Sequence, residues 1–205
     1  MTVGLDIFLN GLIFGCFVLA APVGPIGVLC IRRALAEGRA VGLASGLGAA
    51  TADAAYASVA AFGLTFVSAF LIEQRAWLGL AGGLFLCYLG VRTLLARPAE
   101  HAAEARGGGL LGAYASTFFL TITNPMTILT FVAAFAGLGL ANAGGDYGSA
   151  ALLVLGVFTG SALWWLLLST GVGLLRERFG TGVMRWVNRV SGAVILVFGV
   201  VALLS

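Results

Sequence analysis

The sequence predicts an all-α integral membrane protein with six transmembrane helices, arranged as two inverted three-helix repeats. Three observations lead to this fold class. Of the 205 residues, 60% are hydrophobic and only 9% are charged, whereas about a quarter of an ordinary soluble domain is charged. Six apolar stretches are each long enough to cross a bilayer, which takes roughly 20 residues. The last three stretches align with the first three in the same order.

The predicted spans follow one another with short connections except in the middle of the chain. The second span contains Asp53 as its one charged side chain. A polar cytoplasmic linker over residues 97–110 separates two expected three-helix units, residues 1–96 and 111–205. The pattern leaves open whether residues 62–72 form a re-entrant segment. The predicted spans are 5–31, 40 into the sixties, 76–96, 111–140, 148–175 and 183–204.

The distribution of arginine predicts the orientation of these spans. Ten of the eleven basic side chains, all of them arginines, lie in alternate connections, and only Arg75 falls on the other side. Because cytoplasmic loops carry an excess of Lys and Arg, we expect the arginine-rich loops in the cytoplasm and both termini outside. The net charge of +3 therefore indicates orientation rather than a nucleic-acid partner. The ten are Arg32, Arg33, Arg39, Arg92, Arg97, Arg106, Arg176, Arg178, Arg185 and Arg189.

The alignment of the two halves predicts an internal repeat, and chance matches among the abundant Gly and Leu residues are the alternative. Each repeat contains three spans, so the second copy enters the membrane from the opposite side, as in many secondary transporters. Ser161, which aligns with Thr51, is a weaker candidate for a cavity. The matched residues include Trp77 with Trp186, Gly83 with Gly192, Gly90 with Gly199, Leu94 with Leu203, and Pro25 with Pro125.

Two spans contain residues that interrupt a helix at matching places, Pro22-Val23-Gly24-Pro25 in the first and Thr121-Ile122-Thr123-Asn124-Pro125 in the fourth. Each proline removes a backbone donor and clashes with the carbonyl group four residues earlier, which frees polar backbone groups within the membrane. Such groups must face protein or a wet cavity, and paired interruptions are typical of a transport site. Ordinary proline kinks are the alternative. The predicted substrate-binding residues are Pro22, Gly24, Pro25, Thr121, Thr123, Asn124 and Pro125.

The groups at these interruptions suit a zwitterion. Free amides at the positive end of a half-helix favour a carboxylate. Exposed carbonyl groups, together with the hydroxyls of Thr121 and Thr123, suit an ammonium group. An amino acid would satisfy both kinds of group.

Asp53 is the one acidic residue deep inside a predicted span. It lies about 13 residues into the span, near mid-membrane at roughly 1.5 Å per residue. An ionised Asp there costs about 2.5–3.5 kcal/mol on insertion scales, so we expect it to face the interior and to carry a proton or pair with a cation. Asp53 is therefore the predicted coupling residue. The alternative is a structural hydrogen bond to a neighbouring helix, with Thr51 and Tyr56 close in sequence.

The remaining motifs predict packing rather than chemistry. Cys16, Cys30 and Cys87 form no Cys-x-x-Cys pair, and we expect neither a metal site nor a cofactor nor enzymatic activity. Glycines four residues apart let helices pack closely. They are Gly11 and Gly15, Gly42 and Gly46, Gly79 and Gly83, and Gly156 and Gly160.

The chain resembles the LysE/RhtB family of bacterial amino-acid exporters, the LysE family translocators, over nearly its whole length. The resemblance implies an inner-membrane protein that exports an amino acid, driven by the proton gradient. Ile26-Gly27 follows Gly-Pro here, whereas the branch that exports basic amino acids has Gln-Asn, so a lysine or arginine substrate is not implied. The resemblance rests on Pro22-Val23-Gly24-Pro25, Ile31-Arg32-Arg33, Gly48-Ala49-Ala50-Thr51-Ala52-Asp53 and Thr123-Asn124-Pro125.

Residues and resemblance together predict an inner-membrane secondary transporter that exports an amino acid or a related small metabolite by proton antiport. The expected partners are the substrate, the proton and the lipid bilayer, and a homo-oligomer is compatible with the sequence. A metal-cation exporter of similar architecture is one alternative, and a less favoured one is a transmembrane thiol oxidoreductase. The spans offer one acid and no paired thiols, a poor set for either chemistry.

Overall fold

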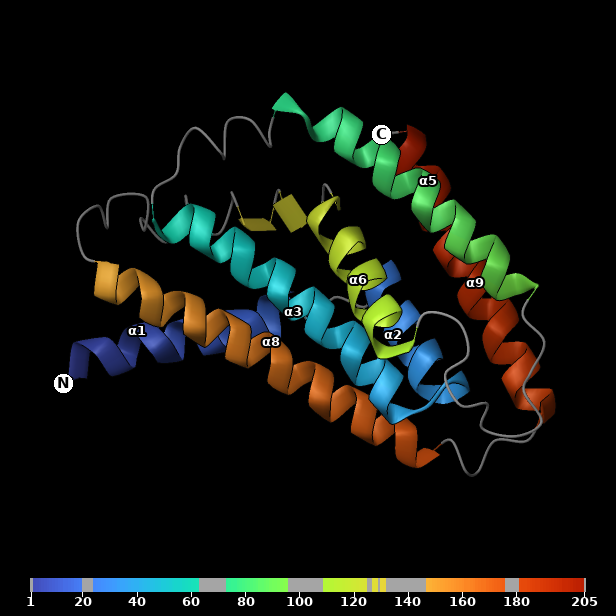
Figure 1. Ribbon diagram of the computed structural model, residues 1–205, viewed down its shortest axis with the longest axis horizontal. Helices are drawn as coiled ribbons and strands as arrows, with labels where there is room; N and C mark the ends of the chain where they lie inside the picture. Colours follow the sequence, from blue (N-terminus) through green and yellow to red (C-terminus); the bar gives the residue numbers. More distant parts are fainter. Residues whose placement is uncertain are drawn as a thin grey trace.

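The structure is a computed structural model that describes residues 2–19, 24–62, 73–95, 109–124, 127–128, 130–131, 147–175 and 181–204. Within these ranges it contains seven α-helices, one π-helix and no strand, which confirms the all-α class (Figure 1). The helices are α1 (Thr2–Ile13), the π-helix η1 (Phe14–Leu19), α2 (Pro25–Ala36), α3 (Arg39–Ala61), α5 (Arg75–Leu94), α6 (Gly109–Ile122), α8 (Tyr147–Leu175) and α9 (Thr181–Leu204).

Helix α3 is the central helix of the bundle and packs against α2, α6 and α8. Ala, Gly and Ser make up much of its sequence, so the neighbouring backbones approach closely. A side chain at Gly48 would overlap the backbone of Tyr114 and Phe118 on α6, and one at Gly46 would overlap Trp165 on α8. The helix that carries Asp53 is thus surrounded by protein on several sides.

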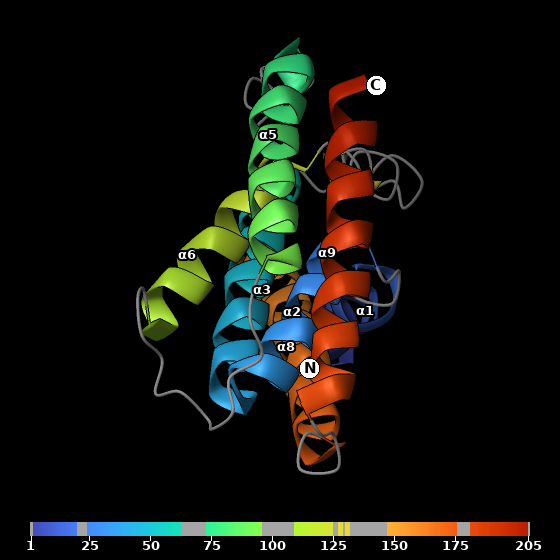
Figure 2. The same cartoon turned by 90° about the vertical axis from the view of Figure 1, so that its right-hand side faces the viewer.

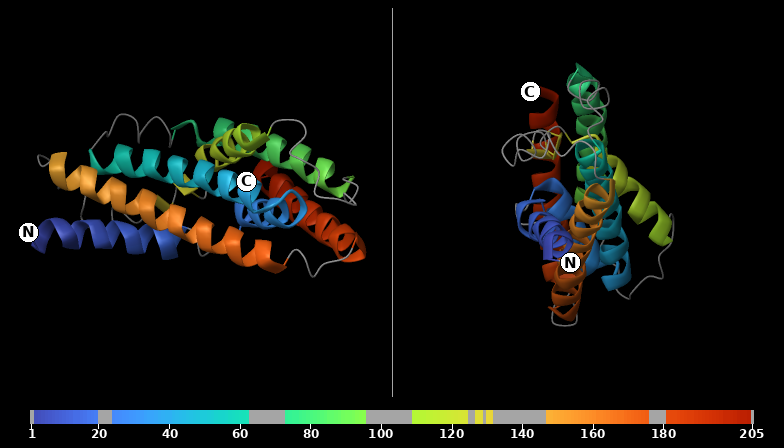
Figure 3. Two further views of the ribbon diagram at one scale, coloured as in Figure 1. Left: turned by 60° about the horizontal axis from the view of Figure 1, so that its bottom comes forward. Right: turned by 90° about the vertical axis from the view of Figure 1, so that its left-hand side faces the viewer.

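Helices α1 and α8 pack through paired glycines. Side chains at Gly11 in α1 and Gly15 in η1 would overlap the backbone of α8, and side chains at Gly156 and Gly160 in α8 would overlap the backbone of α1 and η1. The four-residue spacing of these glycines therefore serves close packing, as predicted. Figure 3 shows α1 alongside α8.

Helices α5 and α9 form a second close pair (Figure 2). They run antiparallel, because Gly83 faces the carbonyl oxygen of Gly199 and Gly192 faces the carbonyl oxygen of Gly90. The outer face of this pair is strongly apolar and open. Trp77 and Trp186 are 69% and 68% exposed there, as suits side chains that meet lipid.

Polar side chains lie inside the bundle and apolar ones outside. Thr117 on α6, Ser161 and Ser169 on α8, and Asn188 on α9 are buried, whereas Leu204 is 83% exposed. Buried hydroxyls between apolar outer surfaces are typical of transmembrane bundles. The chain is therefore a multi-pass membrane protein.

Three helices in the described ranges are long and apolar enough to cross a membrane, over Ala76–Leu94, Tyr147–Leu174 and Arg185–Leu204. They match three of the six predicted spans. The second predicted span forms α3, whose 23 residues are long enough to cross a membrane. Its many small residues give it a lower mean hydropathy than the other three helices. The first predicted span is divided into α1 with η1 and α2, and in the fourth predicted span α6 ends at Ile122, at the second interruption.

The first predicted span differs from expectation at its end. We expected Arg32 and Arg33 in a loop, but α2 continues through both to Ala36. Pro25 occupies the first turn of α2, where its missing amide and fixed φ favour the start of a helix. Residues 63–72, including most of the segment for which a re-entrant path was left open, lie outside the described residues.

The end of α2, the start of α3 and the end of α8 lie at one end of the bundle. Arg32 near the end of α2 bonds Asn188 in α9, and Arg33 bonds Ala113 in α6. Gly173 near the end of α8 faces Arg39 at the start of α3. Figure 1 shows the N-terminus, the end of α3 and the start of α8 at the opposite end. Arg32, Arg33 and Arg39 therefore lie at one end of the molecule, called the arginine-rich end below.

Candidate functional site

The first predicted interruption divides the first span into two helices. The π-helix η1 ends at Leu19 and α2 begins at Pro25, with Gly24 as the residue that caps it. The carbonyl oxygen of Gly24 accepts the amide of Val28, at 3.1 Å. The amides of Ile26 and Gly27 belong to the first turn, which has no earlier carbonyl groups to bond. Pro22 lies outside the described residues.

The second interruption ends α6 at Ile122, and residues 127–128 are helical again. The freed carbonyl groups find new donors. The amide of Asn124 donates to Thr121 O at 3.2 Å, and the hydroxyl of Tyr56 on α3 donates to Ile122 O. Pro125 lies outside the described residues. Freed backbone groups are thus paired inside the protein, as the absence of water in a bilayer requires.

A small hollow brings the two interruptions together. Pro25 and Ile26 line it from α2, and Thr123 and Asn124 line it from the end of α6. Gly82 gives it room, because a side chain there would come within 2.9 Å of Thr123 Oγ1. Its free space is about that of one or two water molecules, which is far less than an amino acid needs. The remaining lining residues are Gly83 and Leu86 of α5, Leu120 of α6 and Ala202 of α9.

Only some of the predicted substrate-binding residues line the hollow. Pro25, Thr123 and Asn124 line the hollow, and Gly24 caps the helix beside it. Thr121 does not line it and is buried, with its hydroxyl donating to Thr117 O at 2.9 Å. The hydroxyl of Thr123, just after the end of α6, donates to Phe119 O of that helix at 2.7 Å, so its lone pairs remain for a cation.

Asp53 is buried, with 5% of its surface exposed. Ser161 on α8 donates a hydrogen bond of 2.8 Å to Asp53 Oδ2. The expected inward orientation of Asp53 is therefore observed, and so is a bond to another helix. Thr51, by contrast, bonds Leu47 O within α3 at 2.8 Å. When Asp53 is ionised, its bond from Ser161 is charge-assisted and roughly twice as strong as a bond between neutral groups.

Tyr56 connects the surroundings of Asp53 to the second interruption. It lies one helical turn after Asp53 on α3, on the same face, and it is buried. Its ring packs against Phe131 with the ring centroids 5.4 Å apart, while its hydroxyl bonds Ile122 O. The sequence placed Tyr56 near Asp53 but did not predict its contact with α6.

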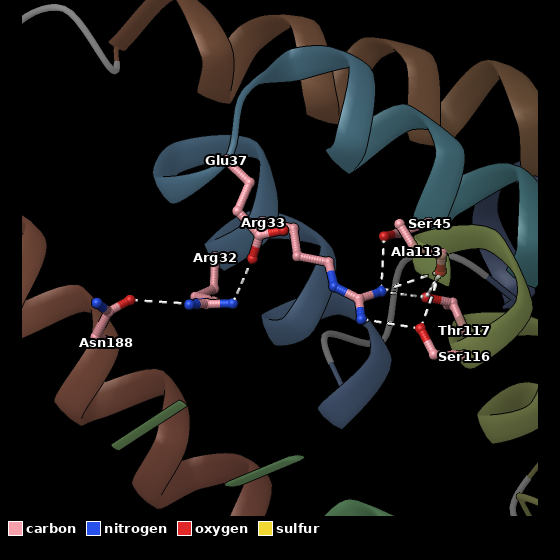
Figure 4. Close-up of polar contacts among 8 residues, drawn as sticks. All are labelled: Arg32, Arg33, Glu37, Ser45, Ala113, Ser116, Thr117 and Asn188. Carbon is pink, nitrogen blue, oxygen red and sulfur yellow. Dashed lines mark hydrogen bonds and ion pairs between the residues drawn. The ribbon is translucent and has the colours of Figure 1, made fainter. Parts of the chain in front are cut away.

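A second polar cluster, which the sequence did not predict, lies at the arginine-rich end (Figure 4). Arg33 is only 8% exposed. Its guanidinium group bonds four neutral oxygens on α3 and α6, at 2.9–3.0 Å. The neighbouring Arg32 points the other way and forms an ion pair with Glu37 at 2.6 Å. The oxygens bonded by Arg33 belong to Ser45, Ala113, Ser116 and Thr117.

The described residues contain no group of three His, Cys, Asp or Glu side chains that could hold a metal ion. The three cysteines are free thiols, with Cys30 buried and the other two half-buried. The residues of the hollow offer backbone and hydroxyl oxygens, amides and one carboxamide. Such groups suit a small polar organic molecule better than a transition metal.

Comparison with known proteins places this arrangement in context. Residues 17–205 match the protein family described as LysE type translocator. A protein of Bacillus subtilis (strain 168), named "Putative amino acid efflux protein YcgF", is 28% identical over 200 residues, covering 95% of this chain and 94% of that protein. The "Uncharacterized membrane protein YahN" of Escherichia coli (strain K12) is 27% identical over 174 residues, covering 82% and 76%. No solved structure matches the chain.

Proposed function

The chain belongs to the family of LysE type translocators, and from this premise we propose that it exports an amino acid or a related small metabolite across the bacterial inner membrane. The observation that carries the proposal is the hollow where two interrupted helices meet. Pro25 reaches it from the first half of the chain, and Thr123 and Asn124 reach it from the second half. Discontinuous helices that meet near mid-membrane are the binding sites of many secondary transporters.

The substrate proposed for this hollow is a zwitterion. The first turn of α2 presents the amides of Ile26 and Gly27 and the positive end of the helix dipole, which favour a carboxylate. The side chains of Thr123 and Asn124 supply oxygen atoms for an ammonium group. The similarity to an amino acid efflux protein points to the same class of substrate.

Proton antiport through Asp53 is the proposed source of energy. Its carboxyl group is buried and bonded to Ser161 in the other half of the chain. Protonation would remove the negative charge that makes this hydrogen bond strong, so the hold between α3 and α8 would depend on the proton. Buried acids in membrane helices are typical carriers of protons in transporters.

Two inverted three-helix repeats, with six crossings, are the architecture we propose. In the aligned repeats, α1 of the first half corresponds to α6 of the second, and α3 corresponds to α8. An exchange of the two halves therefore turns the contact of α1 with α8 into the contact of α6 with α3. The contacts between α5 and α9 follow the same exchange. A side chain at Gly83 would meet Gly199 and Leu203, and one at the aligned Gly192 would meet Gly90 and Leu94. We place the arginine-rich end in the cytoplasm, because basic residues favour that side.

The test is uptake of labelled amino acids into inside-out membrane vesicles with an imposed proton gradient. The protein should accumulate one class of amino acid. Asp53→Asn should reduce gradient-driven uptake at least tenfold, because the side chain can no longer carry a proton. Counterflow of the same substrate without a gradient should persist in this variant, since exchange needs no proton.

The matched control is Asp6→Asn, which makes the same chemical change at an exposed acid in α1 and should leave uptake unchanged. Near-normal accumulation by Asp53→Asn would refute coupling through Asp53. Absence of uptake for every amino acid, by protein shown to be folded and inserted, would refute the proposed substrate class.

A further inference from the structure

Arg33 connects three helices that come from both halves of the chain (Figure 4). Its Nη1 atom donates to Ser45 Oγ on α3 at 2.9 Å, and to Ala113 O and Thr117 Oγ1 on α6 at 3.0 Å each. Its Nη2 atom donates to Ser116 Oγ on α6 at 2.9 Å. One buried side chain thus holds the end of α2 against both neighbours.

The acceptors around Arg33 are all neutral. In the part of the chain that the structure describes, no carboxylate lies within 4 Å of its guanidinium group, whereas Arg32 has Glu37. A buried ion pair is costly to separate. Hydrogen bonds to hydroxyl and carbonyl oxygens can be replaced by water when helices part. The contact around Arg33 therefore suits a junction that opens and closes.

At this junction α2, α3 and α6 are packed together, with Arg33, Ser45 and Thr117 buried, while the hollow is too small for a substrate. Pro25, at the start of α2, lines the hollow, and Arg33 lies two helical turns further along the same helix. With Arg33 bonded to α3 and α6, α2 cannot move away from either of them.

We propose that Arg33 is the gate residue at the cytoplasmic end of the transport pathway. Its hydrogen bonds hold α2 against α3 and α6 in the closed state, and they must break before substrate can enter. We rely on the proposed function for one point, that substrate enters at the arginine-rich end. Arg32 ties α2 to α9 through Asn188, at 3.1 Å, and so supports α2 on the opposite side of the junction.

The chain contains a native reporter of this opening. Cys30 is fully buried and lies one turn before Arg33 on α2. It packs against Ala49 and Ala50 of α3 and Trp165 of α8. Separation of α2 from α3 would therefore expose its thiol. Cys87 lies in α5, outside the junction, and serves as the reference thiol.

The experiment measures alkylation by N-ethylmaleimide, which crosses membranes, in protein reconstituted into lipid vesicles without substrate. One background retains Cys30 alone (Cys16→Ala, Cys87→Ala), and the other retains Cys87 alone (Cys16→Ala, Cys30→Ala). Arg33→Gln should accelerate modification of Cys30 about tenfold or more, because it removes hydrogen bonds from a charged donor. The rate at Cys87 should change less than twofold.

Further variants separate charge from geometry. Arg33→Lys keeps the charge but cannot span the four oxygens with one planar fork, so it should accelerate Cys30 by an intermediate factor. Arg39→Gln removes an exposed arginine at the start of α3 and should have no effect. If Arg33→Gln does not fold, Ser116→Ala combined with Thr117→Val removes two acceptors, and about threefold acceleration is expected.

Two results would overturn the gate. The first is an unchanged rate at Cys30 in a folded Arg33→Gln protein. The second is equal acceleration at Cys30 and Cys87, which would mean general loosening of the bundle. Because no substrate is added, acceleration confined to Cys30 would support the gate even if no amino acid were transported.

Discussion

At the scale of single residues, the bond between Ser161 and Asp53 joins the two halves of the chain at a buried carboxyl group. The hydroxyl lies 2.8 Å from Asp53 Oδ2, and both side chains are buried. A buried carboxylate depends strongly on the few donors that it has, because water does not compete for it. Ser161 is therefore a positioning residue for Asp53.

We predict that Ser161→Ala lowers gradient-driven uptake while the protein stays folded. Loss of a hydrogen bond to a charged group costs about 1.5–3 kcal/mol, which would disfavour the charged state of Asp53 in the transport cycle. The measurement is uptake across a series of external pH values, compared with the native protein.

The control for Ser161→Ala is Thr159→Val, two residues earlier on α8, whose hydroxyl bonds Leu155 O within its own helix at 2.7 Å. It should transport normally. An identical pH profile for native and Ser161→Ala protein would show that the hydroxyl has no part in coupling.

The sequence allowed the burial of Asp53 to be predicted but gave little sign of the role of Arg33. An acid deep in an apolar span has to face the interior, so its position alone is informative. An arginine at the end of a span is usually a topology signal. The partners of Arg33 lie 12 to 84 residues away in sequence, and only the folded arrangement of α2, α3 and α6 brings them together.

At the scale of helices, glycines fix how closely α1 and α8 approach. Side chains at Gly156 and Gly160 would overlap backbone carbonyl oxygens of Phe8 and Leu12. Without a hydrophobic driving force between helices in lipid, such close packing is a main source of association. The spacing of glycines was visible in the sequence, but the partner of each helix was not.

We predict that Gly160→Ala lowers the free energy of unfolding in detergent by about 1–3 kcal/mol, because the added methyl group overpacks the interface. The melting temperature should fall accordingly. The matched control is Gly171→Ala on the same helix, where a side chain would meet nothing within 4 Å. That change should be neutral or stabilise by about 0.5–1 kcal/mol, since alanine favours helix. Equal melting temperatures for the two variants would contradict the close packing of α1 and α8.

The helix interruptions were predictable because proline chemistry is local. Pro25 begins α2 and α6 ends at Ile122, within the two stretches singled out from the sequence. The lining of the hollow by Gly82 of α5 and Ala202 of α9 was not predictable. Apolar helices present many small residues, and which of them faces a cavity depends on the rotation of each helix against its neighbours.

At the scale of the whole molecule, an apolar exterior surrounds a polar interior. Buried Ser, Thr and Asn side chains lie on several helices, while many Leu, Val and Trp side chains are open. Overall hydropathy and span length predicted this class well. The number of crossings is less directly visible, because a central helix such as α3 needs small residues more than hydropathy.

We predict that both termini lie outside the cytoplasm. Alkaline phosphatase, which is active only outside the cytoplasm, should be active when fused after residue 205, and a fluorescent protein fused there should stay dark. The same reporters inserted in the linker over residues 97–110 should give the opposite result. An active phosphatase in that linker would reverse the proposed orientation.

Helix α2 physically links the hollow near its first residue to the junction near its last turn. Its 12 residues span about 18 Å at 1.5 Å per residue, and a helix of this length behaves as a stiff rod. Pro25 at one end borders the hollow, and Arg33 near the other end borders the junction. A tilt of this rod would alter both places in the same instant. Communication across half of the membrane would then require a single moving body and no relay of side chains.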